Sequence, residues 1–233
     1  RSKHAGPVVT YGVEKEADVR GTEVEAVGVG LSRFRLRAGG EEAEVLLPMH
    51  GRHNVLNALA ASAAATRFGL GAREIAGALR TAAPSQMRGE VLRFAEGFTV
   101  VDDSYNSNPR SLVSTAEAVA QGGEGVRRRV VVAGEMLELG ADSDAIHREV
   151  GRELAGLGLD VLWGVRGHAR ALVEGAREAG MGGDAARYFD SSEEAAAAIA
   201  DFVRPGDLVL VKGSRGVHTE TVVEALRERF GSK

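Results

Sequence analysis

A dense run of polar side chains, residues 102–109, directly follows an apolar segment typical of a β-strand, residues 98–101. The run holds two carboxylates, two carboxamides, two hydroxyls and a phenol. In an open α/β sheet, ligands bind at the carboxyl ends of the strands, and a plain turn does not need so many donors and acceptors. The run therefore predicts a site for a polar ligand. The alternative is an elaborate cap on the following helix, made by Asn108 or Ser111.

A second candidate follows the apolar segment 208–211, where Lys212, Ser214 and Arg215 are interleaved with glycines. Lys212 is the only lysine in the long interval between Lys15 and Lys233. Cationic and hydroxyl donors beside a helix N-terminus favour anions. The segment therefore predicts a cradle for a phosphate or carboxylate, although it lacks the GxxxxGK[ST] spacing of a P-loop. The alternative is a turn with a solvated basic pair.

Two further segments carry polar residues that could contact a ligand. Glu135 follows the apolar segment 129–133, so it could orient a substrate amine or a basic side chain; the alternative is a core turn. Asn54 and Asn57, beside His53, share one face of a predicted helix and could read a purine edge, because an amide offers both a donor and an acceptor. The alternative is that Asn54 caps this helix. His147 is expected to be a satisfied structural histidine.

Composition narrows the classes of protein. The 233 residues carry a formal net charge of -4 and no cysteine, and 44% are hydrophobic and 27% charged, as in globular proteins. These values argue against nucleic-acid binding and against thiolate metal sites, and no histidine pair has zinc spacing. We expect no metal site. No secretory signal opens the chain and no apolar run could span a membrane, so a cytoplasmic location is expected.

The periodicity of the chain changes twice. Short, partly alternating segments up to about residue 47 predict a small antiparallel sheet with one wet face. Helical spacing follows from His53 and again over residues 72–83. After a boundary at 84–89, strands and helices alternate, which predicts an α/β fold with a Rossmann-like, mostly parallel sheet flanked by helices. We therefore predict two domains, residues 1–86 and 87–233.

Taken in order, the segments HNVLN, MRGE, DDSYNSNP, GEMLELG and VKGSRG resemble the Mur ligase family. The resemblance is strongest to the branch that adds D-alanyl-D-alanine to UDP-N-acetylmuramoyl-tripeptide in peptidoglycan synthesis. It implies three domains, of which this chain holds the end of the central ATPase domain and the whole C-terminal domain. The P-loop and the Mg²⁺ ligands are then expected upstream of Arg1. The resemblance also implies ATP and Mg²⁺ as cofactors, small-molecule substrates, a monomeric enzyme, and no activity for this chain alone.

The resemblance also assigns roles to residues. It implies that His53, Asn54 and Asn57 contact adenine, that Asp103 binds the ribose, and that Arg88 reaches the ATP phosphates. It implies a catalytic role for Arg88 and Lys212. The dipeptide pocket would be lined by Asn106, Asn108, Pro109, Glu135, Lys212, Ser214 and Arg215. The chain departs from the family pattern at Ser107, Glu135 and Thr219. The last two lie on the expected substrate side, so the exact acceptor amino acid stays open.

Two alternatives stay open. The first is another Mur-type or folylpolyglutamate-type amide ligase. The DDSYNSNP segment argues against this alternative, because other branches of the family vary there. The second is a non-catalytic Rossmann-like module that binds a small ligand or docks onto a partner that carries the ATPase core. The boundary at 84–89 is also expected to be a hinge.

Overall fold

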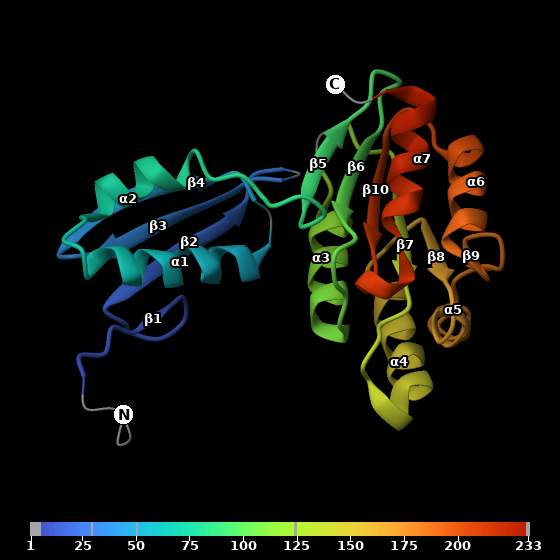
Figure 1. The fold of residues 1–233 in the computed structure, drawn as a ribbon, viewed down its shortest axis with the longest axis horizontal. Coiled ribbons are helices and arrows are strands. Elements are labelled where there is room, and N and C mark those ends of the chain that lie inside the picture. Colours follow the sequence, from blue (N-terminus) through green and yellow to red (C-terminus); the bar gives the residue numbers. More distant parts are fainter. Residues whose placement is uncertain (1–5, 29, 50, 124, 232–233) are drawn as a thin grey trace. The chain divides into compact units, whose positions relative to one another are not determined.

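The computed structural model describes residues 6–28, 30–49, 51–123 and 125–231. The chain divides into two compact units, Arg1–Pro84 and Ser85–Lys233. Each unit has its own layers and its own buried core, so each is described by itself (Figure 1).

The N-terminal unit is a four-stranded sheet with two helices. The strands lie in the order β1 (Tyr11–Gly12), β2 (Val19–Ala26), β3 (Ser32–Ala38) and β4 (Glu41–Leu47), and the helices are α1 (Arg52–Thr66) and α2 (Ala72–Leu79). The β2–β3 and β3–β4 pairs are antiparallel, whereas the short β1 pairs in parallel with β2. Helix α2 ends before the predicted residue 83, and the Thr81 hydroxyl bonds the Ala78 carbonyl oxygen, an alternative to continuing the helix.

Buried and exposed side chains alternate along β3, which explains why one face of this sheet is exposed to solvent. Phe34 and Leu36 are buried and share a core with residues of both helices, such as Leu59 and Ile75. The arginines that alternate with them along β3 point outward and pair with glutamates, as Arg33 does with Glu25. Successive side chains of a strand face opposite ways, so the pattern fixes which face the helices cover.

The C-terminal unit is a six-stranded, mostly parallel sheet in the order β5-β6-β10-β7-β8-β9. Only the edge strand β5 runs antiparallel to its neighbour. The strands are β5 (Glu90–Arg93), β6 (Thr99–Asp103), β7 (Arg128–Gly134), β8 (Val161–Val165), β9 (Ala186–Phe189) and β10 (Asp207–Lys212). The helices are α3 (Pro109–Gln121), α4 (Ser143–Ala155), α5 (Ala169–Glu178), α6 (Ser192–Phe202) and α7 (Glu220–Phe230).

Helices cover both faces of this sheet, which confirms the predicted Rossmann-like architecture (Figure 1). Helices α6 and α7 cover one face, where Trp163, Val209 and Ile199 belong to one buried cluster. Helices α3 and α5 contact the strands from the other face, and α4 packs against α3 and α5. Strand β10 is inserted between β6 and β7, because the chain returns to the middle of the sheet through α6.

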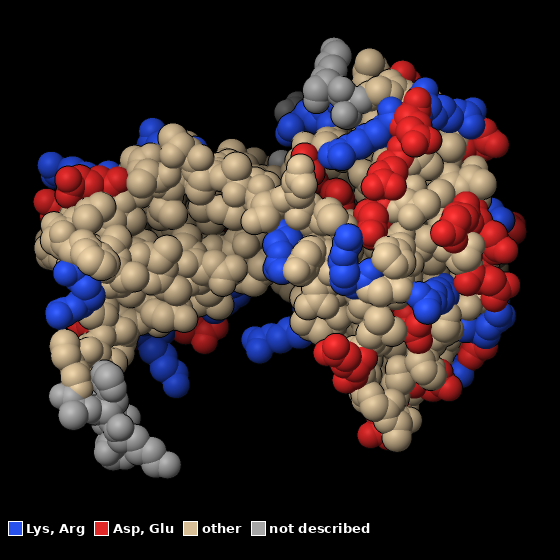
Figure 2. All heavy atoms as spheres, in the orientation of Figure 1, with Lys and Arg blue, Asp and Glu red and all other residues tan. Residues whose placement is uncertain are grey.

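Most ion pairs of the C-terminal unit lie at its surface. Figure 2 shows lysine, arginine, aspartate and glutamate side chains interspersed over its visible face. The pair between Arg229 and Asp201, 2.6 Å apart, is typical, since both side chains are at least half exposed. Exposed pairs of this kind contribute less than about 1 kcal/mol each, because water and salt screen them.

Candidate functional site

The carboxyl ends of β6 and β10 form the point where the connections of the sheet diverge. After β6 the chain passes to α3 on one face, and after β10 it passes to α7 on the other. Such a topological switch point opens a crevice, and it is where ligands bind in open α/β sheets. The strand register places Lys212 of β10 beside Asp103 of β6, so both predicted site residues meet there.

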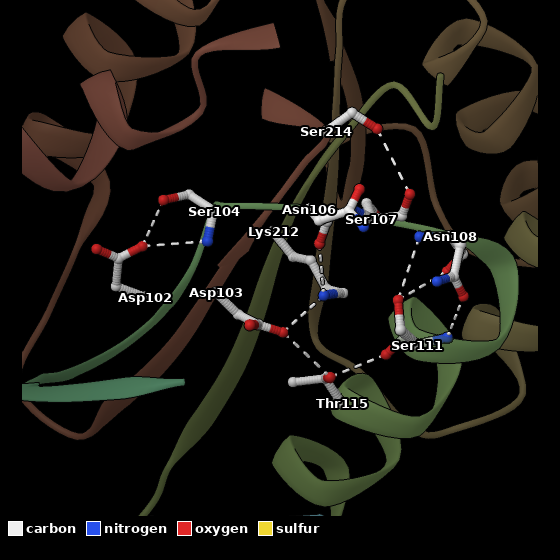
Figure 3. Close-up of polar contacts among 10 residues, drawn as sticks. All are labelled: Asp102, Asp103, Ser104, Asn106, Ser107, Asn108, Ser111, Thr115, Lys212 and Ser214. Atoms are coloured by element: carbon white, nitrogen blue, oxygen red, sulfur yellow. Dashed lines mark hydrogen bonds and ion pairs between the residues drawn. The ribbon is translucent and has the colours of Figure 1, made fainter. Parts of the chain in front are cut away.

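Lys212 and Asp103 form a largely buried ion pair at this point (Figure 3). The lysine Nζ lies 2.6 Å from Asp103 Oδ2, and their side chains are 4% and 15% exposed. Nζ also donates to the backbone carbonyl oxygen of Asn106 at 2.9 Å. Removing an ammonium from water is costly unless it is paired and hydrogen-bonded. Two of its three donors are therefore committed to organising the β6–α3 loop.

The β6–α3 loop is fixed by local hydrogen bonds. The buried Asp102 carboxylate accepts bonds from the backbone and the hydroxyl of Ser104. Burial raises the pKa of Asp102, and the bonds from Ser104 partly oppose that rise. The Asn106 side chain is exposed and accepts a bond from the backbone N–H of Ser107. The Asn106 carboxamide therefore faces solvent, while the carboxylates of Asp102 and Asp103 are largely buried.

Asn108 caps helix α3, as the alternative interpretation of this segment predicts. Its Oδ1 accepts from the backbone N–H of Ser111 at 2.9 Å, and Ser111 Oγ accepts from the N–H of Asn108 at 3.1 Å. Pro109 is the first helical residue, where its missing N–H is not needed. The cap uses only the oxygen of the Asn108 carboxamide, so the amide nitrogen is the part that could meet a ligand.

Ser214 joins the three loops that surround the switch point. Its buried hydroxyl accepts from the N–H of Leu137, after β7, and donates to the carbonyl of Ser107, after β6, at 3.5 Å. The Ser107 hydroxyl is itself buried, and no described group bonds to it. The Ser214 hydroxyl therefore links the loops after β6, β7 and β10, and a contact with a ligand would come in addition to these bonds.

The Glu135 carboxylate contacts the loop after β8. It accepts from the backbone N–H of His168 at 3.0 Å, and a side chain at Gly167 would collide with it. His147 is fully buried; its Nε2 accepts from the N–H of Met136 and its Nδ1 bonds the carbonyl of Ser143. The structure therefore gives His147 the structural role that the sequence predicts.

Two exposed arginines border the turn that begins this unit. Arg215 Nη1 lies 3.5 Å from the sulfur of Met87, and the guanidinium of Arg88 lies 4.0 Å above the ring of Tyr105. The backbone N–H of Tyr105 in turn donates to the carbonyl of Met87. Both guanidinium groups therefore lie beside the β6–α3 loop, where they can contact an anion.

The predicted adenine-binding residues lie on α1 in the N-terminal unit. Gly51, and not Asn54, occupies the N-cap position, so the interpretation of Asn54 as a cap is wrong. The carboxamide of Asn57 is exposed and donates to Asn54 Oδ1 at 3.5 Å, a long bond that constrains it little. His53 is exposed in the same turn. These three side chains form one surface of α1.

Comparison with known proteins decides the family. The model of the Mur ligase, glutamate ligase domain matches residues 87–215, more than half of the chain, and the model of the Mur ligase middle domain matches residues 1–65. The chain belongs to the Mur ligase family. Each family model matches one of the two units, so the similarity extends over both.

Named relatives share one activity. The UDP-N-acetylmuramoyl-tripeptide–D-alanyl-D-alanine ligase of Mycobacterium tuberculosis is 36% identical over 95% of this chain and 47% of its own length. The corresponding ligase of Escherichia coli is 32% identical, over 91% and 45%. A crystal structure of MurF from Acinetobacter baumannii superposes with a TM-score of 0.81 at 32% identity, covering 94% and 47%. This Mur ligase chain thus spans about half the length of these relatives.

Some residues of this candidate site are evident only in the structure. Thr115, on α3, is buried and bonds the carbonyl of Ser111 at 2.8 Å, with its hydroxyl 3.4 Å from Asp103 Oδ2. The spacing of Ser111 and Thr115, one helical turn apart, is the signal that could have indicated it. Glu220, which pairs with Arg215, is the second such residue.

Among the described ranges, no three histidine, aspartate or glutamate side chains gather as they would around a metal ion. No helix in the same part of the chain is both long and apolar enough to cross a membrane.

We expect His147 and His168, which lie near Glu135, to have pKa values on opposite sides of 6.5. The hydrogen bond with Asp144, 2.6 Å long, raises the pKa of His168 above 6.5, whereas burial lowers the pKa of His147 below it. The His168 pair therefore stabilises the fold below that raised pKa and is lost as the pH rises through it. The stability contributed by neutral His147 is instead lost as the pH falls below 6.5.

An NMR titration of the histidine ring protons measures both pKa values. Asp144→Asn should lower the pKa of His168 and move that of His147 much less, because burial is the main cause of the His147 shift. A His168 pKa that does not respond to Asp144→Asn would contradict this assignment.

Proposed function

We propose that this chain is the acceptor-binding part of an ATP-dependent ligase that adds D-alanyl-D-alanine to UDP-N-acetylmuramoyl-tripeptide. The observation that carries the proposal is the buried Lys212–Asp103 pair at the switch point of a sheet that belongs to this family. The named activity of relatives that are 32–36% identical supports the choice of acceptor. We further propose that residues 1–86 form the end of the central ATPase domain and residues 87–233 the C-terminal domain; the family matches over residues 1–65 and 87–215 support this division.

The dipeptide is a zwitterion with one peptide bond, and the site offers a group for each part. Arg215, aided by the third donor of Lys212, would bind the carboxylate, since guanidinium and carboxylate geometries match. The carboxamides of Asn106 and Asn108 would bind the peptide group, with Pro109 beside them and Ser214 behind. Glu135 is the acidic candidate for orienting the amine.

The reaction would proceed through an acyl phosphate of the tripeptide, which the dipeptide amine attacks. This chain would contribute Arg88 to the ATP phosphates, Asp103 to the ribose, and His53, Asn54 and Asn57 to the adenine. Arg88 suits the first role because its guanidinium is exposed and held over Tyr105. Charge neutralisation and positioning, in which Lys212 takes part, would supply the catalysis.

ATP and Mg²⁺ are the cofactors of the proposed ligase. We assign no Mg²⁺ ligand to this chain, because its described residues include no suitable acidic cluster. We further propose a cytoplasmic, monomeric enzyme that acts on small molecules and does not bind nucleic acid or membranes. The sequence contains no GxxxxGK[ST] segment, which is the device that wraps the β- and γ-phosphates of ATP in P-loop enzymes. The 233-residue chain alone is therefore expected to be inactive.

The proposal is tested with a chimera in which this chain follows the upstream half of the Mycobacterium tuberculosis ligase. The chimera should release phosphate from ATP only when both the tripeptide precursor and D-alanyl-D-alanine are present, and the chain alone should release none. Lys212→Met in the chimera should abolish the activity.

Three results would contradict the proposal. Ligation by the chain alone would show that no upstream part is needed. Preference of the chimera for glutamate would indicate a folylpolyglutamate-type ligase. A folded chimera that is inactive with every acceptor would favour a non-catalytic binding module.

A further inference from the structure

Glu220, the first residue of α7, pairs with two exposed side chains of the loop after β10. Its Oε1 accepts from Arg215 Nη1 at 2.7 Å and bonds His218 Nδ1 at 3.2 Å. The Glu220 side chain is only 14% exposed, whereas those of Arg215 and His218 are 57% and 63% exposed. The largely buried carboxylate of Glu220 thus holds the side chains of Arg215 and His218, which both face solvent.

The arrangement carries a local penalty that its hydrogen bonds do not remove. Glu220 Oε2 is buried, and no described group donates to it. A buried acceptor without a donor is destabilising, and such groups are uncommon in native proteins. His218 also adopts the left-handed conformation, with φ 61°, which is unfavourable for a residue with a side chain. Strain and an unpaired acceptor in one short segment are often associated with function.

The bond to Glu220 determines which edge of Arg215 remains available. Both the Glu220 and the Met87 contacts involve Nη1. The edge formed by Nη2 and Nε is therefore the one that can donate two parallel bonds to a planar anion. Without Glu220, the remaining contact would be the 3.5 Å approach to a methionine sulfur, a weak acceptor, and the long side chain would sample many rotamers.

We propose that Glu220 is a positioning residue that fixes Arg215, so that its Nη2–Nε edge receives the carboxylate of the acceptor dipeptide. The inference rests on the proposed function for the identity of the ligand, but not for the orientation of the arginine. A fixed guanidinium loses less conformational freedom when it binds, and this gain in preorganisation appears as affinity.

The test compares Glu220→Ala and Glu220→Gln with Glu224→Gln, the same change at an exposed glutamate one turn further along α7. Modification of Arg215 by phenylglyoxal, followed by mass spectrometry of the intact 233-residue chain, reports how firmly the guanidinium is held. Glu220→Ala should speed that modification by about tenfold, the change that corresponds to losing one charge-assisted bond. Glu220→Gln should give a smaller increase, because its amide oxygen can still accept, and Glu224→Gln should give none.

Calorimetric titration with D-alanyl-D-alanine adds the second readout. Glu220→Ala should weaken binding by about tenfold, with N-acetylated dipeptide affected equally and the dipeptide amide, which lacks the carboxylate, unaffected. Unchanged modification of Arg215 in Glu220→Ala would overturn the positioning role. Faster modification with unchanged affinity would overturn its link to the ligand. Failure of the unsubstituted chain to bind the dipeptide would instead contradict the proposed acceptor, while the modification rate would still decide whether Glu220 positions Arg215.

Discussion

Replacing Lys212 with methionine should lower the free energy of unfolding of the C-terminal unit by about 3 kcal/mol, the effect of leaving one partner of a buried ion pair alone. Methionine preserves most of the side-chain volume, so the loss reflects charge and hydrogen bonding more than a cavity. Asp103 would remain 15% exposed with no ammonium beside it, and the Asn106 carbonyl would lose its donor. Urea unfolding followed by the fluorescence of Trp163, the single tryptophan and a buried residue of this unit, measures the change.

The surface pair between Arg229 and Asp201 is the matched control, because its charged atoms are also 2.6 Å apart. Arg229→Met should change stability by less than about 1 kcal/mol, since both partners are exposed. Adding Asp103→Asn to Lys212→Met should recover part of the loss, because it removes the stranded charge. If Lys212→Met costs no more than Arg229→Met, the buried pair does not organise the switch point.

A second large effect is expected at Gly151, where α4 crosses α5. A Cβ placed on Gly151 would lie 1.9 Å from the carbonyl oxygen of Leu172, and one on Gly175 would lie 2.0 Å from that of Arg148. The two helices therefore meet backbone to backbone through a reciprocal pair of glycines. Gly151→Ala should destabilise the unit by about 3 kcal/mol, because close-packed interiors accept added atoms only by displacing the backbone.

Gly77→Ala, in helix α2, is the control for helix propensity. Apart from its chain neighbours and the backbone of its own helix, no described atom lies within 4 Å of the position its Cβ would take. Alanine should therefore stabilise that helix by up to about 1 kcal/mol. Circular dichroism during thermal unfolding measures both variants. A Gly151→Ala protein as stable as the unsubstituted chain would show that α4 and α5 do not approach as closely as described.

Much of the fold is predictable because local patterns determine it. Alternation along β3 predicts which side chains face the helices, and the apolar runs that become β7 and β10 predict strands buried on both faces. The polar residues that follow β6 and β10 could likewise be assigned to strand ends. What the patterns do not give is the strand order, in which β10 returns to lie between β6 and β7.

The partners within the site depend on that order. Lys212 and Asp103 are 109 residues apart, and only the insertion of β10 beside β6 makes them neighbours. A lysine after an apolar strand suggests an anion site, but the sequence does not show that its ammonium is already paired. The same holds for Glu135, whose carboxylate meets the backbone of His168. Residue type therefore predicts which chemistry is possible, whereas topology decides which contacts are already made.

The most direct test of the central claim is an amide NMR titration of the 233-residue chain with D-alanyl-D-alanine, with L-alanyl-L-alanine as the control. Our account predicts saturable shifts for residues 103–108 and 212–216, at the carboxyl ends of β6 and β10, with the D,D-dipeptide bound more tightly. Shifts confined to other parts of the chain, or no response to either dipeptide, would contradict the assignment of the switch point as the acceptor site.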